Sequence, residues 1–217
     1  MTTLAPPARR LVLADRVFSR TRAMDAVLVV AGAALVTVLA QVTIPLYPVP
    51  ITGQTLAVLL VGSTLGWARG GLALVLYMVL GLVGLPVYAP QDDGSHLTGL
   101  TAFASPSFGY IVGFILSAVL VGWLAEREWD RKILKALVTF VAGSLAVFAI
   151  GLPWLAVVLG RLGAPNDLQS VLVAGFYPFI IGGIIKAAIA AGLLPLAWWG
   201  ANKIAKKRAE NDASPVG

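Results

Sequence analysis

The stretch FYPFIIGGIIKAAIAAGLLPLAWW, residues 176–199, is long and apolar enough to cross a membrane, yet it carries one charge, Lys186. A transmembrane helix needs about 20 mostly apolar residues, and a lysine at its centre costs at least ~2.5 kcal/mol on insertion scales. The whole chain of 217 residues has the same apolar character, with 59% hydrophobic and 12% charged residues and a mean hydropathy of +0.88. Soluble domains are closer to ~25% charged. The sequence therefore predicts an all-α integral membrane protein.

Apolar segments recur along the chain. We expect six transmembrane helices between a basic N-terminal tail (1–23) and a basic C-terminal tail (200–217), at residues 24–44, 52–66, 70–88, 107–125, 133–153 and 170–199. The second segment is short and follows PLYPVP, residues 45–50. Proline cannot continue a helix, and irregular backbone at membrane depth is tolerated only where it is buried in protein or lines a cavity. Residues 45–50 therefore indicate a binding cavity.

The basic residues fix the expected orientation of the bundle. Of 16 Lys and Arg residues, 14 lie in the two tails or in connections on the same side, one (Arg161) lies on the opposite side, and one (Lys186) lies in a span. Positively charged residues accumulate on the cytoplasmic side of membrane proteins. We therefore expect a multi-pass protein of the cytoplasmic membrane with both termini in the cytoplasm, and a retained first span rather than a cleaved signal peptide.

Lys186 is the one Lys or Arg in the interior of a predicted span, since Lys135 lies at the inner end of the fifth, and no acidic residue accompanies it apart from Asp25 at the edge of the first. If its helix begins near Pro178, the lysine lies ~12 Å from the outer end, too far to reach bulk water easily. Its neighbours one turn away are small and leave room for a ligand: Gly182, Gly183, Ala187 and Ala190. Two interpretations stay open, contact with a ligand carboxylate or carbonyl, and packing against backbone carbonyls or water. Intramembrane ionisable residues favour the first.

Three stretches of the chain carry a recognisable pattern: PLYPVPITGQTLAVLLVGSTLGWARGGLALVLYMVLGLVGLPVYA (45–89), SPSFGYIVGFILSAVLVGWLAER (105–127) and YPFIIGGIIKAAIAAGLLP (177–195). In order and spacing they resemble the BioY family, the biotin-binding S-components of energy-coupling factor (ECF) transporters. The resemblance covers about residues 24–199. It implies an S-component bundle of six helices with high-affinity capture of biotin from outside. The pocket would be closed by the loops after the first and third spans. It also implies a transmembrane coupling subunit and two ATPase subunits as partners, and since the chain has no GxxxxGK[ST] phosphate loop, ATP hydrolysis falls to those partners.

The resemblance assigns Lys186 to the ligand and departs from the family at the residue three positions earlier. The family has an acidic residue there, whereas this chain has Gly183. Asp92 or Asp93, from the connection after the third predicted span, or water would then take the place of the missing carboxylate. That connection, YAPQDDGSHLTGL (88–100), is more polar and acidic than the glycine-rich stretch usual in the family.

Four polar side chains at the ends of predicted spans are further candidates for ligand contact: Gln54, Tyr88, Gln91 and Tyr177. Biotin has a ureido ring with two N–H donors and one carbonyl acceptor, and an amide side chain can bond to both. Capping of an irregular helix start is an equal alternative for Gln54. For the two tyrosines, an aromatic belt at the membrane interface is the favoured alternative.

Composition argues against other function classes. With no Cys and a single His, there is almost no scope for a metal site, and we expect neither metal nor cofactor. The basic residues flank the spans and form no nucleic-acid motif, so the expected partners are biotin, membrane lipid and the ECF subunits. An intramembrane enzyme would need a nucleophile with a base, or paired carboxylates, within the spans. A solitary biotin carrier without ATPases and an S-component for a related vitamin are the alternatives.

Overall fold

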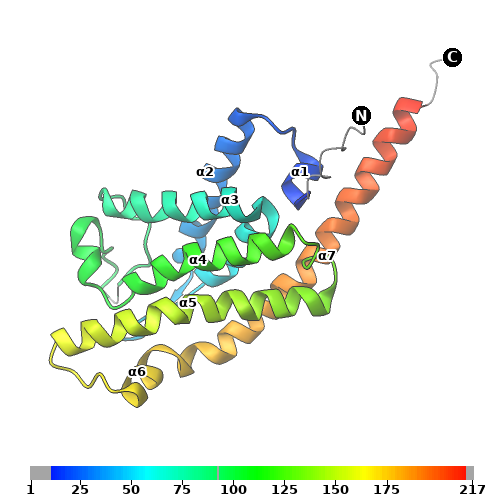
Figure 1. Ribbon diagram of the computed structural model, residues 1–217. Coiled ribbons are helices and arrows are strands. Elements are labelled where there is room, and N and C mark those ends of the chain that lie inside the picture. Colours follow the sequence, from blue (N-terminus) through cyan, green and yellow to red (C-terminus); the bar gives the residue numbers. More distant parts are fainter. Residues whose placement is uncertain (1–10, 92, 214–217) are drawn as a thin grey trace, which may run out of the picture.

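The computed structural model describes residues 11–91 and 93–213 and consists almost entirely of helices (Figure 1). Its elements follow the chain in the order α1 Leu13–Val17, α2 Arg22–Ala40, β1 Thr43–Ile44, β2 Ile51–Thr52, α3 Gln54–Leu82, a 3₁₀ helix η1 Gly99–Ala104, α4 Phe108–Ala125, α5 Ile133–Arg161, α6 Leu168–Gly175 and α7 Tyr177–Ala213. Within the described residues, five helices are long and apolar enough to cross a membrane: α2, α3, α4, α5 and Tyr177–Ile204 of α7. The prediction of an all-helical membrane protein is confirmed at this level.

The count of five differs from the six predicted segments because the second and third of them form one helical element, α3. Gly66 interrupts it with φ +85° and ψ 174°, a conformation that residues with a side chain rarely adopt. The chain folds back there. A Cβ on Gly70 would lie 3.1 Å from the Cα of Gly62, whereas eight residues of a straight helix span ~12 Å. α3 is therefore two half-helices, residues 54–65 and 67–82, that lie side by side.

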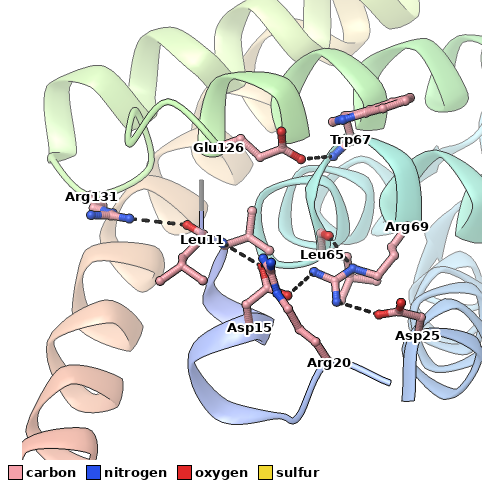
Figure 2. A network of polar contacts seen from close by, with 10 residues as sticks. Leu11, Asp15, Arg20, Asp25, Leu65, Trp67, Arg69, Glu126 and Arg131 are labelled. Atoms are coloured by element: carbon pink, nitrogen blue, oxygen red, sulfur yellow. Dashed lines mark hydrogen bonds and ion pairs between the residues drawn. The ribbon is translucent and has the colours of Figure 1, made fainter. Parts of the chain in front are cut away.

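Charged side chains cap both half-helices at this turn (Figure 2). Arg69 Nε donates to the carbonyl of Leu65 at the end of the first half (2.9 Å), and a carboxylate oxygen of Glu126, next to the end of α4, accepts the N–H of Trp67 (3.3 Å). The first N–H and last C=O groups of a helix have no partner within it. The two side chains supply those partners, so a sharp turn between the half-helices leaves these polar groups satisfied.

Arg69 also ties α1 and α2 to the turn (Figure 2). Its guanidinium pairs with Asp15 (2.7 Å) and with Asp25 (3.0 Å), and Arg20 forms a further ion pair with Asp15. The Asp15 side chain is only 2% exposed. Burial by itself would raise the pKa of Asp15, but hydrogen bonds from Arg20, from the N–H of Val12 and from Arg69 hold that pKa below its usual value. These ion pairs hold the N-terminal segment against the bundle.

The C-terminal part of α7 lies at this same end of the bundle as α1 (Figure 1). Arg16 Nε donates to Asn202 Oδ1 (3.1 Å), and Trp198 Nε1 donates to a carboxylate oxygen of Asp130 in the connection between α4 and α5 (2.6 Å). α7 thus continues as a helix beyond residue 199, where the predicted span ends. We name this end of the bundle the charged end, made of residues 11–21, 66–69, 126–135 and 198–206.

Two predicted helix boundaries near prolines differ from those in the structure. The segment 170–199 is divided at Phe176 into α6 and α7, and α7 begins with Pro178 in its first turn, as predicted. Proline suits a first turn because its missing N–H has no partner to lose there. α5 instead passes through Pro153 and ends at Arg161. Proline is tolerated inside membrane helices where neighbouring groups satisfy the freed carbonyl.

The opposite end of the bundle carries the irregular connections. β1 and β2 pair antiparallel, with Thr43 opposite Thr52 and Ile44 opposite Ile51, so the proline-containing stretch between them forms a loop that returns the chain to the start of α3. The connection from α3 to α4 also lies here and includes η1. We name this the pocket end, made of residues 41–53, 83–91, 93–107 and 162–176.

Candidate ligand-binding site

A cavity opens at the pocket end, between the helices and the irregular connections. Its empty space, open solvent included, is about 980 Å³. Its wall consists of residues around the start of α3, part of the connection from α3 to α4, and side chains from α4, α5 and α7. From the two connections and the first turn of α3 the wall residues are Val49, Pro50, Ile51, Thr52, Gln54, Thr55, Tyr88, Ala89, Gln91, Leu97, Ala102, Ser105 and Ser107. The cavity therefore lies beside the irregular connection whose prolines predicted it.

Three helices supply an aromatic part of the wall. Tyr110 of α4 stacks on Phe179 of α7 with ring centroids 6.2 Å apart, and Phe148 of α5 meets Tyr110 edge-on, also at 6.2 Å. The Tyr110 hydroxyl donates to the carbonyl of Gly175 (2.9 Å), so its polar atom is satisfied away from the cavity wall. Aromatic rings of this kind provide large apolar contact area for a ligand ring.

Lys186 supplies the positive charge of the cavity wall. Its ammonium donates to the carbonyl of Thr52, at the end of β2, and to the hydroxyl of Thr55 (3.0 Å), in the first turn of α3. Among residues 11–91 and 93–213 it forms no ion pair. An ammonium has three N–H donors. Two are used by the protein and one is left for a ligand.

Gly183 lies on the cavity wall one turn before Lys186. A Cβ at Gly183 would meet no atom within 4 Å, so the position of the expected acidic side chain is open space. Asp93 is exposed, accepts the N–H of Ser95 (2.9 Å) and lies in a neighbouring hollow outside the cavity wall. Asp92 lies outside the described residues. Neutral oxygens, and no carboxylate of the described chain, therefore hold the Lys186 ammonium.

Gln54 is 6% exposed and lines the cavity at the start of α3. Its Oε1 accepts a hydrogen bond from the Thr52 hydroxyl (2.8 Å), and its Nε2 donates to the hydroxyl of Tyr77. The backbone N–H of Gln54 is itself bonded to the Thr52 hydroxyl (3.2 Å). The Thr52 hydroxyl therefore supplies the partner of the first N–H of α3, so the Gln54 side chain is not needed as a cap and belongs to the cavity wall.

Tyr88 and Gln91 also line the cavity, from the connection after α3. The Tyr88 hydroxyl donates to the carbonyl of Met78 (2.6 Å), and Nδ1 of His96 lies 2.8 Å from the Tyr88 carbonyl. Tyr177, in contrast, is 52% exposed and is not among the wall residues. The structure thus brings five of the predicted candidates together: Lys186, Gly183, Gln54, Tyr88 and Gln91.

The sequence reasoning missed the aromatic part of the wall and the role of Thr55. A signal for Phe179 was present, because Phe179, Gly183 and Lys186 are spaced four and three residues apart and so share one face of α7. Tyr110 and Phe148 gave no such signal. Each lies in an apolar helix where many aromatic residues would fit equally well.

Comparison with known proteins adds to this geometry. The model of the BioY family matches residues 12–203. A biotin transporter BioY of Thermotoga maritima is 36% identical over 73% of this chain and 86% of its own length, and biotin transporter BioY2 of Lactococcus lactis is 31% identical over 78% and 87%. The crystal structure of an S-component for biotin from an ECF-type ABC transporter has a similar fold, with a TM-score of 0.64 and 23% identity over 82% of this chain and 93% of that one. The chain belongs to the BioY family.

Proposed function

We propose that this protein captures biotin with high affinity and takes it up across the cytoplasmic membrane as the substrate-binding subunit of an ECF-type transporter. The observation that carries the proposal is a mostly apolar cavity with Lys186 on its wall, in a chain of the BioY family. Relatives that are 31–36% identical over about three quarters of the chain bear the name biotin transporter. The function is binding and transport, not catalysis.

The chemistry of the wall suits the parts of biotin. The apolar ring system would lie against Tyr110, Phe148 and Phe179. The third N–H of Lys186 would bond to the carboxylate or to the ureido carbonyl, and the Gln54 amide offers both a donor and an acceptor to the ureido edge. A few fixed polar groups in an apolar pocket are the usual design of such sites.

The turn at Gly66 supports six membrane crossings. The two halves of α3 lie side by side, so each would cross as a separate helix, and α1 and the end of α7 then lie on the same side. Most Lys and Arg residues belong to that side, which the positive-inside rule assigns to the cytoplasm. Both termini would be cytoplasmic, and the cavity would face outward.

The partners would be membrane lipid, a transmembrane coupling subunit and two ATPase subunits. The chain has no phosphate loop of its own, so an ATP-driven cycle requires them. Copurification of ATPases from native membranes would support this assembly. Uptake of biotin into vesicles that contain this chain alone would instead favour the solitary carrier.

The test is biotin binding to the purified chain in detergent, by isothermal titration. We expect saturable binding at sub-micromolar concentration, with dethiobiotin weaker. A folded chain that does not bind biotin would overturn the proposal. A thermal-shift screen with other vitamins then distinguishes an S-component for a related vitamin, which would respond to that vitamin and not to biotin.

A further inference from the structure

Tyr77 is a fully buried tyrosine whose hydroxyl lies beside the cavity wall without belonging to it. Its exposed fraction is 0%, and it lies on the second half of α3. Its hydroxyl accepts a hydrogen bond from Nε2 of Gln54, on the first half. The bond therefore crosses the helical hairpin and joins a buried side chain to a wall residue of the cavity.

This bond is one end of a continuous polar chain. The Gln54 amide oxygen accepts from the Thr52 hydroxyl (2.8 Å), and the carbonyl of Thr52 accepts from the Lys186 ammonium. Each link is buried or half-buried, where a hydrogen bond is costly to leave unmade. Tyr77 thus fixes the far end of a chain that runs through Gln54 to the charged group of the cavity.

The chain leaves a defined set of polar groups for a ligand. A glutamine amide has two N–H donors and two acceptor lone pairs. In Gln54 one donor is used by Tyr77 and one lone pair by Thr52. One donor and one lone pair remain, and their directions are set by the two bonds already made. A ligand would meet a side chain that is ordered before it binds, and such preorganisation lowers the entropic cost of binding.

Packing holds Tyr77 itself in place. Its ring meets the ring of Tyr88 edge-on with centroids 5.5 Å apart, and the Tyr88 ring lies over Gly81, where a Cβ would come within 2.2 Å of it. The absence of a side chain at Gly81 is thus what admits the ring that supports Tyr77. The hydroxyl of Tyr77 is therefore presented to Gln54 from a fixed position.

We propose that Tyr77 is a positioning residue for ligand recognition: it holds the Gln54 amide, and through Thr52 the Lys186 ammonium, in the geometry that receives the ligand. The inference rests on the proposed function, because it takes biotin as the molecule bound in the cavity. It adds a residue that contacts no ligand and acts only through Gln54.

The experiment is a double-mutant cycle on biotin affinity, measured by titration of the purified chain. Tyr77→Phe removes one oxygen and leaves the ring, so we expect biotin to bind about 10-fold more weakly, the effect of one buried hydrogen bond. In a Gln54→Leu background the same substitution should have no further effect, because the amide that it positions is gone. Thr64→Val is the matched control: it removes a bonded hydroxyl from the same helix, about three turns from Gln54, and should leave the affinity unchanged.

The outcomes separate this inference from the proposed function. A folded wild-type chain that does not bind biotin overturns both. If the wild type binds biotin and Tyr77→Phe binds it with the same affinity, the positioning role alone is overturned. It is also overturned if Tyr77→Phe lowers the affinity equally in the wild-type and the Gln54→Leu backgrounds, since an equal loss indicates a packing effect. If Tyr77→Phe does not fold, Thr52→Val tests the amide from its other hydrogen bond. A several-fold loss that disappears in Gln54→Leu supports the inference, and unchanged affinity overturns it.

Discussion

The charged end and the pocket end of the bundle satisfy their polar groups in different ways. At the charged end, Asp15 has two arginine partners, and the guanidiniums of Arg127 and Arg131 lie over tryptophan rings at 3.4 and 4.3 Å. At the pocket end, Lys186 has only neutral oxygens as partners, and the position of a possible carboxylate, Gly183, is empty. At the charged end the ion pairs are made within the protein, although Asp130 Oδ1 and Arg131 Nε are buried there without a hydrogen-bond partner. At the pocket end, the unused bonding capacity belongs to a cation that faces a cavity.

The difference separates stability from binding. Ion pairs that are complete within the protein hold α1, α2 and α3 together and offer little to a ligand. A cation held by two hydrogen bonds, with a third donor free, is stable enough to be buried and still gains from an anion or a carbonyl. Substitutions at the two ends should therefore affect different measurements.

The largest expected effect is that of Lys186→Met on biotin affinity. Loss of a charged donor to the ligand, together with its bonds to Thr52 and Thr55, should weaken binding by ~10- to 100-fold, because hydrogen bonds to charged groups contribute about 1.5–3 kcal/mol. The measurement is titration with biotin, and a retained unfolding temperature would show that the fold is intact. Lys135→Met, at the charged end, is the control and should bind normally. Equal affinity for both variants would remove Lys186 from the site.

Arg69→Met, at the charged end, should lower the stability of the fold and leave biotin affinity unchanged. This substitution removes the partner of Leu65 and Asp25 and one of the partners of Asp15, so the free energy of unfolding should fall by about 2 kcal/mol, less than for a fully buried pair because Asp15 keeps Arg20. Thermal unfolding in detergent should show a decrease of several degrees. Arg127→Met is the control, with little change. Biotin affinity should be unaffected in both, and a large loss of affinity would contradict the separation of the two ends.

The free energy of unfolding should depend on pH through Asp130, at the charged end. Burial raises the pKa of Asp130 to about 6, although the hydrogen bond from Trp198 opposes the rise, and the neighbouring charges are Arg131 and Glu128. Since the carboxyl ionises near pH 4 in the unfolded chain, its contribution to stability is complete below about pH 4 and is lost as the pH rises to about 6.

The measurement is the unfolding temperature of wild type and Asp130→Asn between pH 4.5 and 7.5. The amide does not ionise, so the difference between variant and wild type should move in favour of the variant as the pH rises, by about 1–2 kcal/mol in total. Comparing the two proteins cancels the opposite trend of other carboxyls, such as Asp15. A difference that stays constant across this range would contradict the expectation.

The smallest effect is expected for Gly183→Asp, which sharpens the comparison by adding a charge to the pocket end. The new carboxylate would fit without a clash, one turn from Lys186, and would offer an acceptor to the ureido N–H groups. We expect biotin to bind about fivefold more tightly than to Gly183→Asn, which adds the same volume without charge. Weaker binding would mean that the acid neutralises Lys186 at the expense of the ligand.

Much of the fold follows from local properties of the sequence. Hydropathy places α2, α4 and the membrane part of α7, because a run of about 20 apolar residues has few alternatives to a membrane helix. Lys186 and Gly183 could be placed at a cavity because burial of an unpaired charge needs a reason. The BioY resemblance predicted from motifs is confirmed by the family match.

The rest depends on contacts between residues distant in the chain. Tyr177 was a candidate because it begins a helix, but the start of a helix does not determine which side of it faces a cavity: Phe179, two residues on, lines the wall instead. The contact between Tyr77 and Gln54 exists only because the chain turns back at Gly66. No sequence pattern within either half-helix predicts the contact between Tyr77 and Gln54.

The turn at Gly66 has a consequence for which changes in chain length can be tolerated. Gln54 lies 12 residues before Gly66 and Tyr77 lies 11 residues after it. The hydrogen bond between them therefore depends on two helical segments of nearly equal length, counted from the turn. Adding a single residue to either segment would advance its end by ~1.5 Å and rotate it by ~100°. The Tyr77 hydroxyl would then no longer lie beside the Gln54 amide. Insertions and deletions should therefore accumulate in the connection 83–107 and be rare between residues 54 and 77.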